Sequence, residues 1–167
     1  MMTEREKGTL ACFSLGSNLG DRAGNLDAAK ALMAARMGTL EAESMIYESA
    51  SWGYDSKHLF YNCCLAIRTT VEPLPLMEMA LQVEREMGRI RQESGYGDRI
   101  IDIDLLLFGE VSRDHPGLVL PHPKMEMRRF VMVPLAEIVP DMLHPVSGLT
   151  VAELLRRCQD PSVVRPV

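Results

Sequence analysis

The stretch Arg99-Ile100-Ile101-Asp102-Ile103-Asp104-Leu105-Leu106 places two carboxylates inside an otherwise apolar, β-branched run. Side chains two residues apart in a strand point to the same face of a sheet, so Asp102 and Asp104 converge on one patch. Like charges this close repel each other, and burying them unpaired is costly. A divalent cation resolves the conflict, and Mg²⁺ commonly binds one or two carboxylates together with substrate phosphates. The stretch therefore predicts a strand that carries a metal-assisted phosphoryl-transfer site; a solvated strand face is the alternative.

The flanking sequence predicts strands and helices of one small fold. We expect strands at 9–15, 39–49, 59–70 and 101–108, helices at 22–37 and 73–87, and two further helices near 128–138 and 151–157. Leu26 and Met33 lie at helical spacing after a possible N-cap at Asp21, and Pro73 and Gly88 bracket the second helix. The order β-α-β-β-α-β is that of a ferredoxin-like core. We therefore expect an α+β fold, an antiparallel sheet with helices packed on one face, plus a C-terminal helical extension.

The strand face that carries the two aspartates is expected to continue with apolar residues that enter the core. Leu106 and Phe108 come after Asp102 and Asp104 at the same spacing of two. This pattern predicts that the acidic half of the face opens where the strand starts and that its downstream half is buried.

Composition limits the class of protein. The 167 residues are 47% hydrophobic and 25% charged, which is typical of one globular domain, here 9–167 after a flexible tail at 1–8. The net charge of −5 argues against nucleic acid as a partner. We expect no membrane association, because no apolar run approaches the roughly 18 residues of a membrane span and the N-terminus has no signal-peptide pattern. We expect a cytoplasmic monomer whose four cysteines (Cys12, Cys63, Cys64 and Cys158) are reduced packing residues.

The segment 88–99 has the composition of a phosphate-binding loop. It contains three Gly, three Arg and one aromatic residue in twelve positions. Arginine binds phosphate in a bidentate manner and is always charged, and glycines provide hinges for closure over a substrate. A solvated basic loop would have a similar composition, so this segment alone leaves both interpretations open.

Other side chains fit a flat heterocyclic ligand and its phosphates. Phe60 and Asn62 share one strand face, and with Phe130 they would suit a planar, hydrogen-bonding ring; core aromatics are the alternative. His122 lies between two prolines and could donate to a phosphate, or could be an ordinary surface histidine. For Glu84, near the end of the second helix, a surface salt bridge is the default expectation, and a charge-compensating or ribose-contacting role is the alternative.

These segments together resemble a known enzyme family. The matching pieces are GSNLGDR at 16–22, YESASWG at 47–53, FYN at 60–62, GRIR at 88–91, RIIDIDLLLFG at 99–109 and LPHPKMEMRRFVMVPL at 120–135. They resemble the 6-hydroxymethyl-7,8-dihydropterin pyrophosphokinases of folate biosynthesis. The resemblance implies transfer of the β,γ-pyrophosphoryl unit of ATP to the pterin hydroxymethyl oxygen, with release of AMP.

The resemblance also implies a role for each motif residue. Asp102 and Asp104 would bind two Mg²⁺ ions, and Arg89 and Arg99 would act in the chemical step. The residues on the ATP side would be Glu84, Arg91, Arg99, His122 and Arg128. The pterin would contact Gly16, Ser49, Ala50, Trp52, Phe60, Asn62, Tyr96 and Phe130, with its ring between the two phenylalanines and Tyr96 closing the site.

Some positions depart from the common family pattern, and two other functions stay open. Thr-x-Pro is common where this chain has Ser49-Ala50-Ser51, Trp where it has Tyr96, and Pro where it has Asp98. We expect a modest effect of the first change, because the contacts there would be mainly with the backbone, and an effect of the other two on loop closure rather than on the reaction type. The alternatives are a non-catalytic ligand-binding module on the same fold and an ATP-dependent kinase for another heterocycle.

Overall fold

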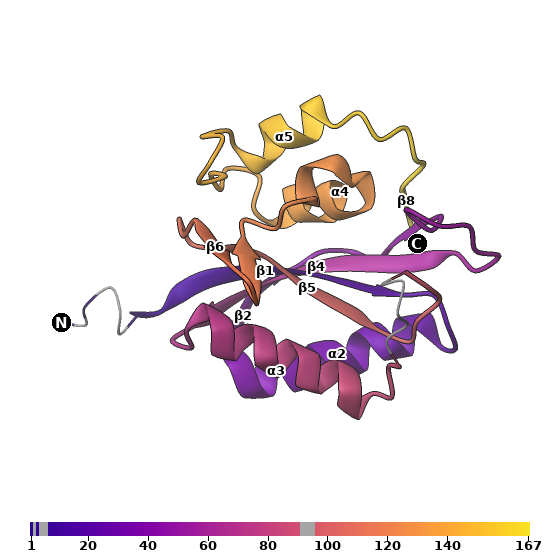
Figure 1. The fold of residues 1–167 in the computed structure, drawn as a ribbon, viewed down its shortest axis with the longest axis horizontal. Coiled ribbons are helices and arrows are strands. Elements are labelled where there is room, and N and C mark those ends of the chain that lie inside the picture. Colours follow the sequence, from indigo (N-terminus) through magenta and orange to yellow (C-terminus); the bar gives the residue numbers. More distant parts are fainter. Residues whose placement is uncertain (2, 4–6, 91–95) are drawn as a thin grey trace.

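The computed structural model describes residues 1, 3, 7–90 and 96–167 of the chain, drawn as a ribbon in Figure 1. Its elements are β1 (Thr9–Ser17), α2 (Arg22–Met37), β2 (Thr39–Glu43), β3 (Tyr47–Ser49), β4 (Phe60–Thr69), α3 (Pro73–Glu86), β5 (Asp102–Phe108), β6 (Arg113–His115), β7 (Leu118–Leu120), the 3-10 helix η1 (Met125–Met127), α4 (Arg129–Ile138), α5 (Val151–Arg157) and β8 (Arg165–Pro166). The predicted helices and three of the four predicted strands are confirmed, with ends that differ by at most two residues. The three short strands β6, β7 and β8 were not expected.

The main sheet is antiparallel throughout. Its strands lie in the order β5-β1-β4-β3-β8, and β2 also pairs with β4. The single strand expected at 39–49 is wrong, because the chain leaves the ladder between β2 and β3. There Ser44 takes over the pairing: its Oγ accepts a hydrogen bond from the Cys64 amide, and its own amide donates to the Cys64 carbonyl.

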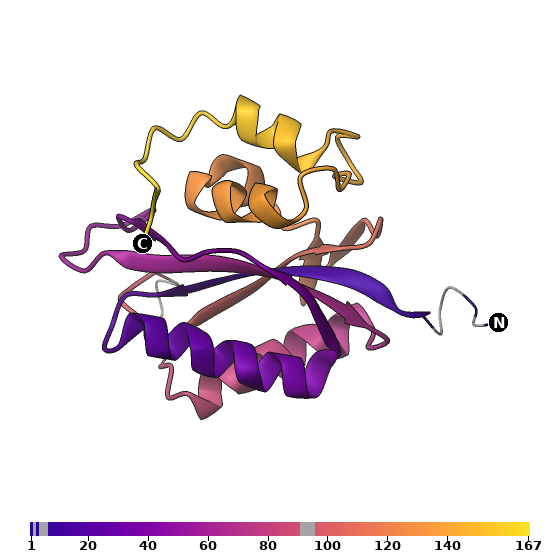
Figure 2. The ribbon, with the colours of Figure 1, turned by 180° about the vertical axis from the view of Figure 1, so that it is seen from behind.

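Helices cover both faces of the sheet. Helices α2 and α3 lie on one face, and α4 and α5 lie on the other, as the two opposite views show (Figures 1 and 2). The expectation of helices on one face therefore holds only for α2 and α3. The reason is that Cys12, Cys64 and Ala66 make the second face apolar as well, and this face packs against Val131 and Met132 of α4.

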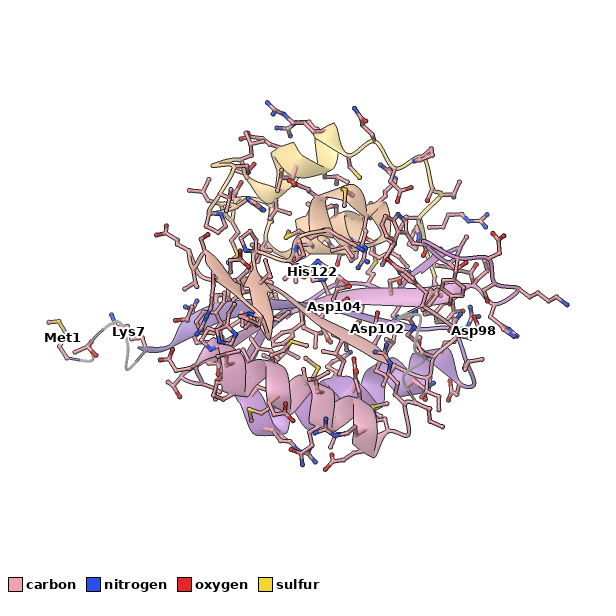
Figure 3. The ribbon with its side chains drawn as sticks, viewed as in Figure 1. Met1, Lys7, Asp98, Asp102, Asp104 and His122 are labelled. Atoms are coloured by element: carbon pink, nitrogen blue, oxygen red, sulfur yellow. The ribbon has the colours of Figure 1, made fainter. Side chains whose placement is uncertain are left out.

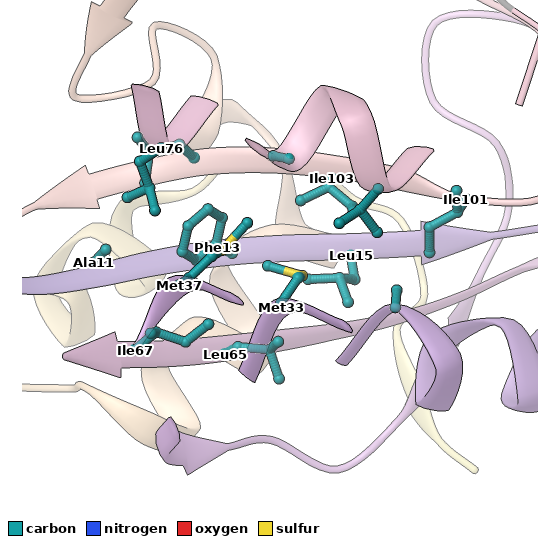
Figure 4. Close-up of a cluster of buried hydrophobic side chains, with 14 of the residues drawn as sticks. Ala11, Phe13, Leu15, Met33, Met37, Leu65, Ile67, Leu76, Ile101 and Ile103 are labelled. Carbon is teal, nitrogen blue, oxygen red and sulfur yellow. The ribbon is translucent and has the colours of Figure 1, made fainter. Parts of the chain in front are cut away.

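The larger core lies between the sheet and the α2–α3 layer (Figure 4). Phe13 and Leu15 of β1 and Leu65 of β4 are fully buried there, against Met33 of α2 and Leu76 of α3. Fully burying one such side chain stabilises a protein by about 1.5–3 kcal/mol, more than a typical surface ion pair. This layer therefore holds the strands that carry the polar residues of the opposite face.

A β-bulge alters the downstream half of β5. The pairing of β1 with β5 shifts between Cys12 and Phe13, so that Leu106 stays on the α4 side while Phe108 joins the core under α2 and α3. The expectation that Phe108 shares the face of the two aspartates is therefore wrong. A bulge adds one residue to a strand and so reverses the facing of the residues beyond it.

Two local features fix the ends of α2. The Asp21 carboxylate caps its first turn by accepting a hydrogen bond from the Gly24 amide at 3.0 Å. At the other end, a Cβ on Gly38 would lie 2.1 Å from the Arg68 carbonyl oxygen. Only glycine fits this turn, which brings the chain directly from the helix into β2. In the described part of the chain, no helix is long and apolar enough to span a bilayer.

Candidate active site

The strand register brings the polar residues of three strands side by side. Asp102 pairs with Gly16 of β1, and Gly16 pairs in turn with Asn62 of β4. Asp104 pairs with Ser14 in the next row. These five residues line one cavity of about 310 Å³ on the α4 side of the sheet. Figure 3 shows Asp102 and Asp104 along β5, with His122 between the strand and α4.

A buried ion-pair network holds Asp102 at the edge of the cavity. Nη1 of Arg89 lies 2.8 Å from Asp102 and 2.8 Å from Glu84, and Arg99 lies 3.3 Å from the other oxygen of Asp102. The Glu84 carboxylate also accepts a hydrogen bond from the Ile103 amide at 2.8 Å. The Glu84 side chain is only 2% exposed, so the default expectation of a surface salt bridge is wrong. The contacts of Glu84 instead connect the end of α3 to the start of β5.

Arg128 brings a further positive charge that is poorly compensated. Its guanidinium lies 3.9 Å from Asp104, 4.6 Å from the ring centre of Trp52 and 5.9 Å from that of Phe130. Its Nε is buried and has no hydrogen-bond partner among the described residues. A buried donor left in this state favours an anionic ligand that can accept from it.

The carboxylate pair has the donor chemistry of a Mg²⁺ site. Burial raises the pKa of Asp104, and the charge of Asp102 raises it further. A divalent cation would relieve both effects. The structure contains no group of three or more His, Cys, Asp or Glu side chains able to hold a metal within the described ranges. Two carboxylates are nevertheless enough for Mg²⁺ when phosphate oxygens complete the coordination, so the residues present fit this ion.

His122 is a neutral hydrogen-bond donor. Burial, with the nearby Arg128 charge, lowers the pKa of His122 to about 4. Its Nδ1 accepts a hydrogen bond from the Lys124 amide at 3.2 Å, which places the ring proton on Nε2. The imidazole can therefore donate to an oxygen in the cavity without carrying a charge.

The other half of the cavity suits a flat ring. Phe60, Trp52, Tyr54, Tyr96 and Phe130 all line it. The amide nitrogen of Asn62 donates to Ser49 Oγ at 2.8 Å and to the Tyr47 carbonyl at 3.3 Å. The amide oxygen of Asn62 has no partner among the residues that the structure describes, so it can accept a hydrogen bond from a ligand N–H.

The family model of 7,8-dihydro-6-hydroxymethylpterin-pyrophosphokinase (HPPK) matches residues 12–140. The chain belongs to the HPPK family. It is 43% identical over 136 residues to the 2-amino-4-hydroxy-6-hydroxymethyldihydropteridine pyrophosphokinase of Porphyromonas gingivalis, covering 80% of this chain and 92% of that protein. It is 41% identical over 160 residues to the pyrophosphokinase of the same name from Methylorubrum extorquens, covering 95% and 99% of the two chains.

Solved structures share the HPPK fold at low sequence identity. The chain superposes on a crystal structure of HPPK-DHPS in complex with substrates with a TM-score of 0.76, at 14% identity and 90% coverage. For Plasmodium falciparum HPPK-DHPS the TM-score is 0.72, at 16% identity and 93% coverage. This chain spans 43% and 44% of the length of those two chains.

The HPPK motif residues meet in this one cavity. The predicted residues that line it are Gly16, Ser49, Ala50, Trp52, Phe60, Asn62, Arg89, Tyr96, Arg99, Asp102, Asp104, His122, Arg128 and Phe130. Glu84 lies behind the cavity, against Arg89, and Arg91 lies outside the described residues. Ser14 and Tyr54 also line the cavity and were missed. The spacing of Ser14 and Gly16, two residues apart on β1, could have indicated the first; nothing in the loop sequence singles out the second.

Proposed function

We propose that this HPPK-family protein transfers the pyrophosphoryl group of ATP to 6-hydroxymethyl-7,8-dihydropterin, giving the pterin diphosphate and AMP in folate biosynthesis. One observation carries the proposal: a single cavity joins aromatic walls to a cluster of arginines and carboxylates. A non-catalytic binding module would not need a phosphate clamp next to its ring-binding walls. A phosphotransferase for a heterocyclic alcohol needs both, at adjacent positions.

The aromatic half would bind the pterin. Its ring would stack between Phe60 and Phe130, and the free amide oxygen of Asn62 would accept a hydrogen bond from the ring edge. Gly16 lets the ring approach the sheet, since the Phe60 ring and the Asn62 oxygen already lie 3.5 Å from where its Cβ would be. Ser49, Ala50 and Trp52 would complete the wall, and Tyr96 would close the site.

The charged half would bind the triphosphate. Asp102 and Asp104 would hold two Mg²⁺ ions, which supply charge stabilisation for the transferring phosphoryl group. Arg89 and Arg99 reach Asp102 already, so they would contact the same phosphates and act in the chemical step. His122 and Arg128 would serve the nucleotide side, with Arg91 contributing from outside the described residues.

Catalysis would depend on positioning. The described residues of the cavity include no separate group of obvious identity as general base, and phosphoryl transfer needs mainly alignment and charge stabilisation. Glu84 would act by holding Arg89 in place rather than by touching the nucleotide, as its burial and its two hydrogen bonds at 2.8 Å indicate.

The proposed architecture is a ferredoxin-like core with a C-terminal helical extension, formed by residues 9–167 as one domain. The strand order β5-β1-β4-β3 supports it, with β2 and β3 together replacing one strand of that core. We propose a monomer in a reducing compartment, the cytoplasm, which fits the four free thiols.

Labelled ATP tests the reaction type. With radioactive phosphorus at the β-position, the proposal predicts that the label leaves the nucleotide and appears in the pterin product. A γ-label must take the same route. A β-label retained in ADP would mean single-phosphoryl transfer and would refute the proposed activity. Replacing the pterin by other heterocyclic alcohols tests the ring specificity in the same assay.

A further inference from the structure

Asp98 forms a hydrogen-bond centre that no step of the proposed reaction uses. Its Oδ1 accepts hydrogen bonds from the side-chain amide of Asn18 at 2.9 Å, from the Tyr54 hydroxyl at 3.1 Å and from the Ser56 hydroxyl at 2.6 Å. Its other oxygen lies 3.9 Å from Nε2 of His58. These donors come from two separate segments, the turn after β1 and the loop between β3 and β4. Asp98 therefore joins three pieces of chain that are distant in sequence.

The buried Asn18 also holds Arg99, the residue that follows Asp98 in the sequence. Asn18 is 2% exposed, and its side-chain oxygen accepts a hydrogen bond from the Arg99 amide at 2.7 Å. The main-chain N–H of Asn18 donates to the Arg99 carbonyl at 3.0 Å. Both main-chain polar groups of Arg99 are thus held by one residue, and the same residue donates to Asp98. The main chain at 98–99 is fixed on both sides.

Each side of this centre reaches the cavity. On one side, Arg99 extends to 3.3 Å from Asp102, and its Nε donates to the Gly97 carbonyl at 2.8 Å. On the other side, Tyr54 lines the cavity and lies 6.4 Å, ring centre to ring centre, from Tyr96. In Figure 3 Asp98 lies beyond Asp102, toward the same end of the sheet.

We propose that Asp98 is a positioning residue that couples Tyr54, which lines the aromatic half of the cavity, to Arg99. It binds the loop 50–58 through Tyr54 and Ser56, and it fixes Arg99 through Asn18. The hydrogen bond from Ser56, with those from Asn18 and Tyr54, lowers the pKa of Asp98, which keeps the acceptor ionised at neutral pH. The kinetic part of this inference depends on the proposed function; the structural part does not.

The kinetic test replaces Asp98 by Ala. The side chain is 32% exposed, so its loss leaves no buried void. We expect kcat to fall about tenfold and KM for ATP to change less than about twofold, because misplacing an aligned group costs mainly turnover. Asp55→Ala is the matched control: it removes the same charge from the loop that Asp98 anchors, at an exposed position with no hydrogen bond or ion pair to the described residues. We expect it to leave kcat unchanged. Asp98→Asn, which keeps an acceptor oxygen, should recover most of the lost turnover.

A double-variant cycle separates positioning of Arg99 from general loosening. In an Arg99→Lys background the additional Asp98→Ala change should cost less than about twofold, because residues acting through one group are not additive. A full tenfold additional loss there would overturn the coupling to Arg99.

Trp52 provides a readout that needs no activity. It is the only tryptophan of the chain and lies in the loop that Asp98 anchors. Asp98→Ala should increase acrylamide quenching of its fluorescence, and Ser56→Ala should do so to a smaller extent, while Asp55→Ala should not. Equal quenching and equal kcat in the Asp98 and Asp55 variants would overturn the inference. Increased quenching in the Asp98 variant, with a wild-type protein that forms no AMP, would instead refute the proposed function and leave the structural coupling standing.

Discussion

Glu84→Gln tests the buried network behind the cavity. The change keeps the shape of the side chain and removes its charge, at a site where the Glu84 and Arg89 side chains are only 2% and 6% exposed. A hydrogen bond to a charged group contributes about 1.5–3 kcal/mol, and breaking a buried pair costs about 3–5 kcal/mol. Gln can still accept from the Ile103 amide, and Arg89 keeps Asp102 as a partner. We therefore expect a net loss of about 2–3 kcal/mol in the free energy of unfolding.

The same helix supplies the control. Glu78 pairs with Arg85 on α3 at 3.0 Å, but their side chains are 65% and 60% exposed. Glu78→Gln should change the free energy of unfolding by less than about 0.5 kcal/mol, as surface pairs do. Urea and thermal unfolding at pH 7 measure both variants. For a chain of this size, the Glu84 change should lower Tm by about 4–12 °C. Equal Tm values for the two variants would refute the argument that burial makes Glu84 a structural centre.

Further predictions concern the two halves of the cavity and its histidine. Asp102→Asn or Asp104→Asn should lower turnover by at least about a hundredfold, as loss of a group that stabilises transition-state charge does. Asp104→Asn should leave the Tm unchanged or raise it, because a like-charge repulsion disappears, whereas Asp102→Asn should lower it, because Arg89 and Arg99 lose a charged partner; full activity in both variants would contradict the metal assignment. Phe60→Ala should weaken pterin binding by about 10- to 100-fold, from lost stacking and burial, with ATP affinity changed less than about twofold in calorimetric titrations. Equal losses of affinity for pterin and for ATP would contradict the division of the cavity into a pterin-binding half and a triphosphate-binding half. The pKa of His122 is lowered to about 4, so its contribution to stability is present above its ordinary value near 6.5 and is lost as pH falls toward 4. Through His122, the wild-type protein should lose about 2 kcal/mol of its free energy of unfolding between pH 7 and pH 5, as measured by urea unfolding. His122→Asn should abolish this loss; an unchanged pH dependence would contradict a neutral, buried imidazole.

Local patterns predicted most of the fold. The spacing of apolar residues, the cap at Asp21 and the glycines at turns indicated the helices, because these signals act within a few residues of chain. The β-bulge beside Cys12 and the break at Ser44 depend on pairing with other strands, so the sequence did not reveal them. The packing of α4 and α5 on the second face depends on tertiary contacts in the same way.

The candidate site shows the same division between local and long-range information. Asp102 and Asp104 could be predicted as a pair because a spacing of two gives one face in any strand. That Gly16 and Asn62 lie in the row of Asp102 depends on strand order, which periodicity alone does not give. Glu84 was misplaced for a related reason: its position beside the apolar stripe of α3 does not show that Arg89 and the start of β5 cover it.

The most direct test of the central claim is the formation of AMP from ATP, Mg²⁺ and 6-hydroxymethyl-7,8-dihydropterin, with matched reactions that omit the pterin or the metal. If one cavity joins a pterin-binding wall to a metal-assisted phosphate clamp, AMP should form only when all three components are present, in equal amount with the pterin diphosphate. AMP formation without pterin, ADP as the product, or no product from folded protein would contradict that account.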